Sequence, residues 1–269
     1  MNQIQSTLRS RREKFTDVKR AAHVLQPILG IAETVWKRAV DRTLGFMLLG
    51  GAALIVALVL TTDLQESDAR AALLLIHVFV TMLVIFVGTT EIPRDLATRN
   101  VQVFLSKPLS RAGYVCGKFA GLLILAELIL VAYVACLGVS LAAKGFFHGA
   151  DFVHGLARTT LQLGTLCALL VGLSVVLPEM AATILGVAFV ILSYVTFILP
   201  PAARLLVPEW LQPFTLLVYL ALPNSQHYLW TPDAGSASFF FAMLCLYSVS
   251  YCICALTAAS LWFRRRDLL

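Results

Sequence analysis

The residues most able to do chemistry gather in one segment of the chain, residues 89–121. Its charged side chains include Glu91, Arg94, Asp95, Arg99, Lys107 and Arg111. Asp95 and Arg99 are four residues apart with the acid first, an order that stabilises a helix. Charges of both signs beside the apolar residues Ile92 and Leu96 suit contact with another protein, or with anionic lipid headgroups. We therefore expect recognition rather than catalysis from this segment.

Two prolines inside the charged segment set the bounds of one short amphipathic helix, which we predict over residues 91–105. Pro93 can begin a helix, because its missing N–H costs nothing in the first turn. Lys107-Pro108 ends the helix, since a proline disfavours helical conformation in the residue before it. A second helix is expected to run from Ser110 into the following apolar run.

Patterns that would indicate catalysis or metal binding are absent from the sequence. It contains no GxxxxGK[ST] phosphate-binding loop and no HExxH zinc motif. The six cysteines lack CxxC spacing, and the five histidines are scattered without a Met/Cys/His cluster. We expect no enzymatic activity, no metal and no cofactor in this chain.

The composition places these residues in a membrane protein. Of the 269 residues, 59% are hydrophobic and 13% are charged, and the mean hydropathy is +0.84. Soluble domains carry about 25% charged residues, and a soluble fold of this length could not hide so much apolar surface. The composition thus excludes an ordinary soluble enzyme, and it excludes a disordered chain.

Six apolar runs are long enough to cross a bilayer, which takes about 20 residues in a helix. They cover residues 43–60, 71–90, 119–142, 159–177, 181–199 and 238–263. The predicted fold is an all-α integral membrane protein with one six-span domain over 43–263. The charged loop between spans two and three, 89–118, is its main cytoplasmic loop.

Polar or amphipathic segments flank the spans. Residues 1–20 are expected to form a cytoplasmic tail, and residues 264–269 a cytoplasmic C-terminus. Residues 21–42 carry apolar side chains at helical spacing, which predicts an amphipathic helix in the membrane interface with Trp36 at headgroup depth. The alternative is a plain extension of the first span.

The outer region 200–237, before the last span, contains a broken apolar stretch. Its apolar part, 210–223, is too short to span and contains two prolines, so we predict a re-entrant segment. Unpaired backbone groups at membrane depth are tolerated only inside protein or beside a water-filled cavity. We therefore expect an outer gate formed by Pro213, Leu217, Pro223 and Asn224.

Two features in and just before the third apolar run concern contacts between helices. Gly113, Gly117 and Gly121 recur every four residues, and such a stripe lets another backbone approach closely. Glu127 lies near the middle of the membrane, where a charge costs about 2.5–3.5 kcal/mol. It should face the bundle interior or be protonated. Three roles remain open: lining a pathway, bonding to a neighbouring helix or second copy, or none.

The distribution of lysine and arginine predicts the orientation. Nine precede the first span, five lie in the 89–118 loop and three follow the last span, whereas the other loops hold four. Because basic residues accumulate on the cytoplasmic side, we predict that both termini are cytoplasmic.

The charged segment also resembles a known family. An acidic residue ends the second run, a charged helix follows, and a LSKPLSR turn precedes GKFAG at the start of the third run. The closing WFRRRDLL, the interfacial helix and the broken stretch before the last span fit the same pattern. These features resemble permease subunits of the second ABC export superfamily, in particular the branch of permeases for multicopper-enzyme maturation.

The resemblance implies partners and a function. The chain would be a permease of the cell membrane, in bacteria the inner membrane. It would form a homodimer on two ATPase subunits, which would bind ATP and Mg²⁺. Residues 91–105 would be the coupling helix that contacts the ATPase. The dimer would either export a substrate or relay ATPase motion to an extracytoplasmic accessory protein. Membrane lipid surrounds it, and no nucleic-acid partner is expected.

Overall fold

The computed structural model describes most of the chain beyond residue 65. The described residues are 26, 29–38, 50–51, 66–98, 100–101, 110–143, 149–195, 208, 211–213, 225, 228 and 237–265. Five long helices account for most of them: α3 (Glu66–Ala97), α5 (Arg111–Ala143), α6 (Gly149–Val176), α7 (Glu179–Val195) and α11 (Ala237–Arg265). A short helix covers residues 29–38. Within these residues the fold is helical throughout.

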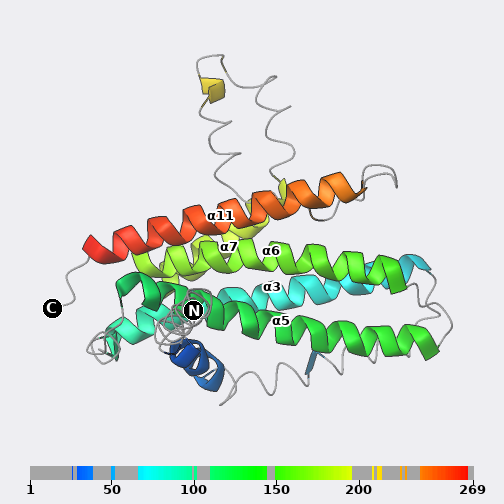
Figure 1. The fold of residues 1–269 in the computed structure, drawn as a ribbon, viewed down its shortest axis with the longest axis horizontal. Helices are drawn as coiled ribbons and strands as arrows, with labels where there is room; N and C mark the ends of the chain where they lie inside the picture. The colour runs from blue at the N-terminus through cyan, green and yellow to red at the C-terminus, as the bar shows by residue number, and fades with distance from the viewer. Residues whose placement is uncertain are drawn as a thin grey trace, which may run out of the picture.

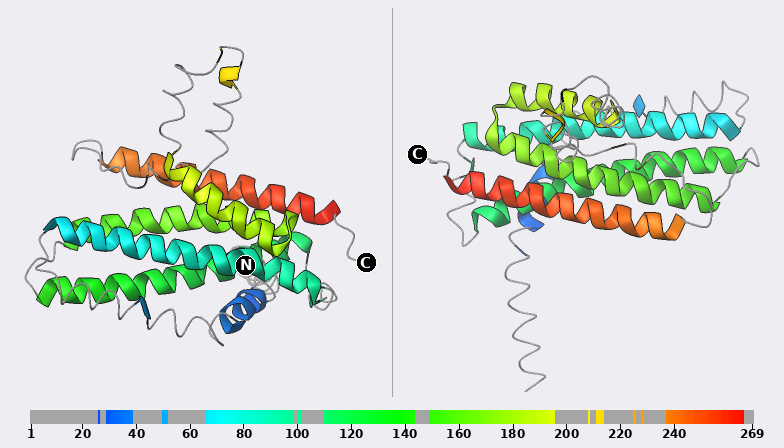
Figure 2. Two further views of the ribbon diagram at one scale, coloured as in Figure 1. Left: turned by 180° about the vertical axis from the view of Figure 1, so that it is seen from behind. Right: turned by 90° about the horizontal axis from the view of Figure 1, so that it is seen from above.

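The long helices form one bundle (Figure 1). α3, α5 and α6 pack against one another, α11 packs on α6 and α5, and α7 packs on α3 and α6. Figure 2 shows the same neighbours from behind and from above. The C-terminal ends of α3 and α11, the N-terminal end of α5 and the 29–38 helix all lie at one end of the bundle. We call this the charged end, because it holds the ionic site described below.

The helix lengths agree with a multi-pass membrane protein. Four stretches are long and apolar enough to cross a bilayer: Ala72–Ala97, Arg111–Ala143, Val153–Val176 and Phe239–Arg265. α7 is apolar but has 17 residues. The predicted first span, 43–60, lies outside the described residues except for Gly50 and Gly51. The full six-span arrangement therefore stays a prediction.

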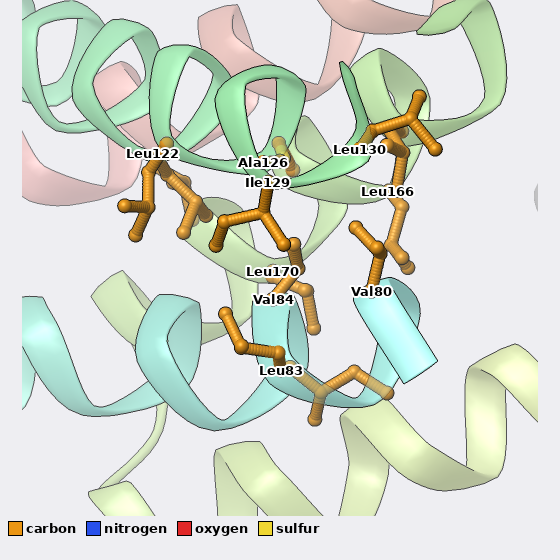
Figure 3. Packing of buried hydrophobic residues seen from close by; sticks show 14 of the residues in the cluster. Val80, Leu83, Val84, Leu122, Ala126, Ile129, Leu130, Leu166 and Leu170 are labelled. Carbon is orange, nitrogen blue, oxygen red and sulfur yellow. The ribbon is translucent and has the colours of Figure 1, made fainter. Parts of the chain in front are cut away.

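A core of aliphatic side chains holds α3, α5 and α6 together (Figure 3). Leu122, Ala126 and Ile129 of α5 recur at helical spacing and face Val84 of α3 and Leu170 of α6. The opposite face of α5 is also apolar, although it is exposed. A helix that is apolar all round is typical of a membrane span, and packing between such helices depends on close van der Waals contact.

The predicted helix start at Pro93 is wrong. α3 continues without a break through Pro93 to Ala97, seven residues beyond the predicted end of the span. A proline is tolerated inside a membrane helix where neighbouring helices hold the local backbone. Here the two turns around Pro93 carry Glu91 and Asp95, whose side chains are fixed by other helices. The rest of the predicted 91–105 helix lies mostly outside the described residues.

Candidate functional site

Four charged side chains from three helices meet at the charged end of the bundle. Lys118 of α5 places its Nζ 2.6 Å from Glu91 Oε2 and 2.9 Å from Asp95 Oδ2, both on α3. Arg38 of the 29–38 helix also pairs with both acids, with Nη1 3.4 Å from Glu91 Oε2 and in contact with Asp95 Oδ1. We call Arg38, Glu91, Asp95 and Lys118 the charge cluster.

Three members of the charge cluster are buried, and Arg38 is half-buried. The exposed fraction of the side chain is 1% for Lys118, 0% for Asp95, 10% for Glu91 and 28% for Arg38. Burying ions is costly unless they are paired and hydrogen-bonded. Two positive and two negative charges balance, so the cluster is neutral as a whole.

Asp95 is the most fully bonded member of the cluster. Its carboxylate accepts from Arg38 and Lys118, and also from the Tyr114 hydroxyl at 2.8 Å. Hydrogen bonds to an ionised group are stronger than those between neutral groups. Burial would lower the pKa of the Arg38 guanidinium, but the hydrogen bond and charge of Asp95 outweigh burial and raise that pKa. Arg38 therefore stays charged.

Helical spacing explains how the sequence builds the cluster. Glu91 and Asp95 are four residues apart on α3, and Tyr114 and Lys118 are four apart on α5. Residues at this spacing lie on one face of a helix. The two pairs face each other where α3 and α5 pack together.

The 29–38 helix reaches the cluster through close contact with α5. A Cβ atom added to Gly121 would lie 2.9 Å from the Cα of Ala32 and 3.0 Å from its carbonyl oxygen. Only glycine allows two backbones to approach this closely. Ile31 and Val35 are buried on the same side, while Lys37 points outward. This contact directs Arg38 to the two acids.

α11 is tied to the same end. Arg111 Nη1 donates to the carbonyl oxygens of Phe263 and Arg264, at 3.1 and 2.9 Å. The rings of Tyr114 and Phe263 stack with centroids 5.6 Å apart. A cation is favourable at a helix C-terminus, where carbonyl groups lack partners. The charged end therefore joins four helices.

Away from this end, neutral polar side chains connect α7 to its neighbours. The Tyr194 hydroxyl lies 2.7 Å from His77 Nε2 on α3 and accepts from Gln162 Nε2 on α6 at 3.2 Å. The hydroxyls of Ser193 and Ser225 are 2.7 Å apart. Gln162, Ser193 and Ser225 also line a cavity of about 10 Å³, the room needed by a single water molecule.

A family model described as "ABC-2 family transporter protein" matches residues 4–268, nearly the whole chain. The chain belongs to the ABC-2 transporter family. It is therefore a membrane permease subunit of an ABC transporter, and its partner is an ABC ATPase subunit. No curated protein matches the chain. The narrower branch of multicopper-enzyme maturation stays an expectation from the sequence.

The predicted ATPase contacts of this ABC-2 permease have different surroundings in the structure. Arg94 is exposed as expected. Glu91 and Asp95 are not displayed; they are buried because Lys118 and Arg38 neutralise them inside the protein. Arg111 binds the end of α11. Arg99 and Lys107 lie outside the described residues.

The other predicted residues also differ in their surroundings. Of the glycine stripe, Gly121 makes the close contact with Ala32, Gly117 is buried and Gly113 is half-buried. Glu127 Oε2 accepts from Thr160 Oγ1 of α6 at 2.9 Å, and its Oε1 is buried without a partner among the described residues. Of the predicted gate, Pro213 is exposed, and Leu217, Pro223 and Asn224 lie outside the described residues.

Sequence reasoning missed Arg38, Tyr114 and Lys118 as site residues. The charge distribution along the sequence identified Lys118 and Arg38 only as basic residues of predicted cytoplasmic segments. A signal was present, because Tyr114 and Lys118 repeat the four-residue spacing of Glu91 and Asp95. Within the part of the chain that the structure describes, no group of three or more His, Cys, Asp or Glu side chains could hold a metal ion.

Proposed function

We propose that this ABC-2 permease exports a substrate as a homodimer driven by two ATPase subunits, and that the charge cluster transmits ATPase motion into the membrane helices. The observation that carries the proposal is the cluster itself, in which Lys118 and Arg38 bind the same two acids on α3. It joins α3, α5 and the 29–38 helix at one point.

The position of the cluster supports a role in transmission. α3 ends at Ala97 and α5 begins at Arg111, so residues 98–110 of the predicted cytoplasmic loop connect the two helices. Arg94 is exposed on the last turns of α3, next to the buried Asp95. An ATPase that moves this loop would pull on both helices at the residues that anchor them.

The energetics favour motion of the charged end as one unit. Removing one partner of a buried ion pair typically costs 3–5 kcal/mol, whereas neutral hydrogen bonds between membrane helices average about 0.6 kcal/mol. The weaker links are those that hold α7 to α3 and α6. Opening the bundle around α7 would separate neutral groups, whereas breaking the cluster would leave charges unpaired inside the protein.

The test is charge reversal at the two basic residues of the predicted loop that lie nearest the end of α3. Arg94→Glu combined with Arg99→Glu should abolish co-purification of the ATPase or uncouple ATP hydrolysis from the permease, while the protein remains in the membrane. Lys37→Glu is the matched control, because its side chain is 73% exposed and lies outside the cluster. Normal ATPase binding and stimulation in the double variant would contradict the docking role.

The second candidate function is a relay to an extracytoplasmic partner without solute movement. It requires a docking surface in the outer region 200–237, whereas export requires polar groups between the spans. The neutral hydrogen-bonding groups around Tyr194 favour export. Movement of a substrate into inside-out vesicles that contain the complex, dependent on ATP, would distinguish export from the relay.

A further inference from the structure

The C-terminal end of α11 combines exposed cations with an exposed aromatic ring. Arg264 and Arg265 lie in the last turn of the helix, and both are exposed. Among the described residues, neither side chain has a carboxylate partner. Arg266 and Asp267 continue the run in the sequence, so three positive charges and one negative charge follow Trp262 and Phe263. The end of the helix therefore carries a surplus of positive charge.

The backbone at this helix end is also prepared for an anion. Carbonyl groups without partners give a helix C-terminus a partial negative charge, which would repel one. Here Arg111 of α5 donates to the carbonyl oxygens of Phe263 and Arg264, at 3.1 and 2.9 Å. Its guanidinium group offsets the partial negative charge, so the positive charge of the exposed side chains is not cancelled by the helix.

Phe263 determines which side of the helix end faces outward. Its ring is buried and stacks on Tyr114 of α5. Leu261 and Trp262 are 54% and 53% exposed. They precede Arg265 by four and three residues, and residues at these spacings are neighbours on a helix surface. An exposed guanidinium group thus lies beside an exposed apolar side chain and an exposed indole ring.

α11 is also the least covered of the candidate spans. Only 11% of its most apolar stretch is buried, whereas half or more of that stretch is buried in each of the other three. Figure 1 shows α11 along one edge of the described bundle. Leu246, Val249 and Ile253 are among its exposed side chains. In a bilayer this apolar surface would contact acyl chains, and the same helix leads to the two arginines.

We propose that the C-terminal end of α11 is a binding site for an anionic phospholipid, with Arg264 and Arg265 on the phosphate group and Trp262 beside the headgroup. A guanidinium group binds phosphate oxygens through two parallel hydrogen bonds, and tryptophan is enriched at headgroup level. A soluble phosphate would gain nothing from the apolar side of α11, whereas a lipid would. The site lies outside the proposed coupling mechanism, and it is independent of whether the permease exports a substrate or relays motion.

The experiment titrates lipid into the full chain in detergent micelles and counts bound lipid by native mass spectrometry. The probes are phosphatidylglycerol and phosphatidylcholine with identical acyl chains, because the second carries a cation beside its phosphate. Phosphatidylglycerol should bind more tightly. Arg265→Gln should raise the apparent Kd of phosphatidylglycerol about fivefold, and Arg264→Gln combined with Arg265→Gln about 25-fold. The Kd of phosphatidylcholine should change much less.

Lys37→Gln is the matched control. It also removes one exposed cation at the charged end, but the Lys37 ammonium group already pairs with Glu33 at 2.7 Å. This variant should bind phosphatidylglycerol as the unchanged chain does. Arg265→Lys keeps the positive charge and should retain most of the affinity. Equal Kd values for the two lipids, or equal losses in the Lys37 and Arg265 glutamine variants, would overturn the inference.

ATPase co-purification and the mass of the assembly are measured on the same preparations, because an exposed basic surface could instead contact another protein. The double glutamine variant should retain both the ATPase and its oligomeric state. Loss of the ATPase or of a second copy with unchanged binding of phosphatidylglycerol would assign the end of α11 to a protein contact and overturn the lipid site. Lost lipid selectivity with normal ATPase binding would support the site and leave the proposed coupling intact.

Discussion

At the scale of single residues, Lys118 keeps the charge cluster neutral. Its side chain is less exposed than that of Arg38, the other cation, and it binds both acids, Glu91 and Asp95. A lysine in this position would be unfavourable without them, because an ammonium ion is strongly hydrated in water. The four charges are therefore interdependent, and the loss of one changes the environment of the others.

Lys118→Met tests this interdependence. Methionine keeps the volume but leaves a net negative charge in a buried place, so we expect a loss of about 3–5 kcal/mol in the free energy of unfolding. Thermal unfolding in detergent would measure it. Adding Glu91→Gln restores neutrality and should recover part of the loss. Lys37→Met, at an exposed ion pair, should change little. Equal behaviour of the Lys118 and Lys37 variants would contradict a structural role for the cluster.

At the same scale, variants of Glu127 can show whether this residue links two helices by a hydrogen bond or contacts the substrate. Its bond from Thr160 links α5 to α6. Glu127→Gln keeps an acceptor for Thr160, so a structural role predicts stability and export like those of the unchanged protein. Glu127→Leu removes the acceptor and should lower the unfolding temperature. Reduced export by the glutamine variant with normal stability would instead indicate contact with the substrate, and a leucine variant normal in both respects would exclude both roles.

At the scale of helices, the contact between the 29–38 helix and α5 depends on one small residue. Gly121→Ala would push a methyl group into the backbone of Ala32, and backbone cannot move aside as a side chain can. We expect a loss of about 1–3 kcal/mol in unfolding free energy. Gly164→Ala is the control, since a Cβ there meets nothing within 4 Å and alanine favours the helix. A Gly121 variant as stable as the Gly164 variant would contradict the close packing.

Sequence patterns predicted where the helices lie, but they did not predict which charged residues pair with one another. Hydropathy located α3, α5, α6 and α11, because a membrane span needs a long apolar run whatever its neighbours are. It placed the end of α3 too early, since the charges after residue 90 were taken to lie in water. Glu91 and Asp95 stay within α3 because Lys118 and Arg38, distant in sequence, neutralise them. Pairing of this kind depends on how helices pack, and no local pattern contains that information.

The whole molecule is held together by two kinds of polar contact. The charged end joins α3, α5, α11 and the 29–38 helix through ion pairs and the contacts of Arg111. α7 is held by neutral hydrogen bonds. If ATPase motion enters at the charged end, that end must face the cytoplasm. The positions of basic residues along the sequence lead to the same orientation.

The orientation can be tested with single cysteines in a chain whose six native cysteines have been replaced. Ser67→Cys and Ser236→Cys should react with an impermeant thiol reagent added outside intact cells, because the predicted outer segments contain both. Ser106→Cys should react only after the membrane is opened, since it lies in the predicted cytoplasmic loop 89–118. Labelling of the Ser106 variant from outside would invert the topology. It would also place the charge cluster on the wrong side to receive motion from a cytoplasmic ATPase.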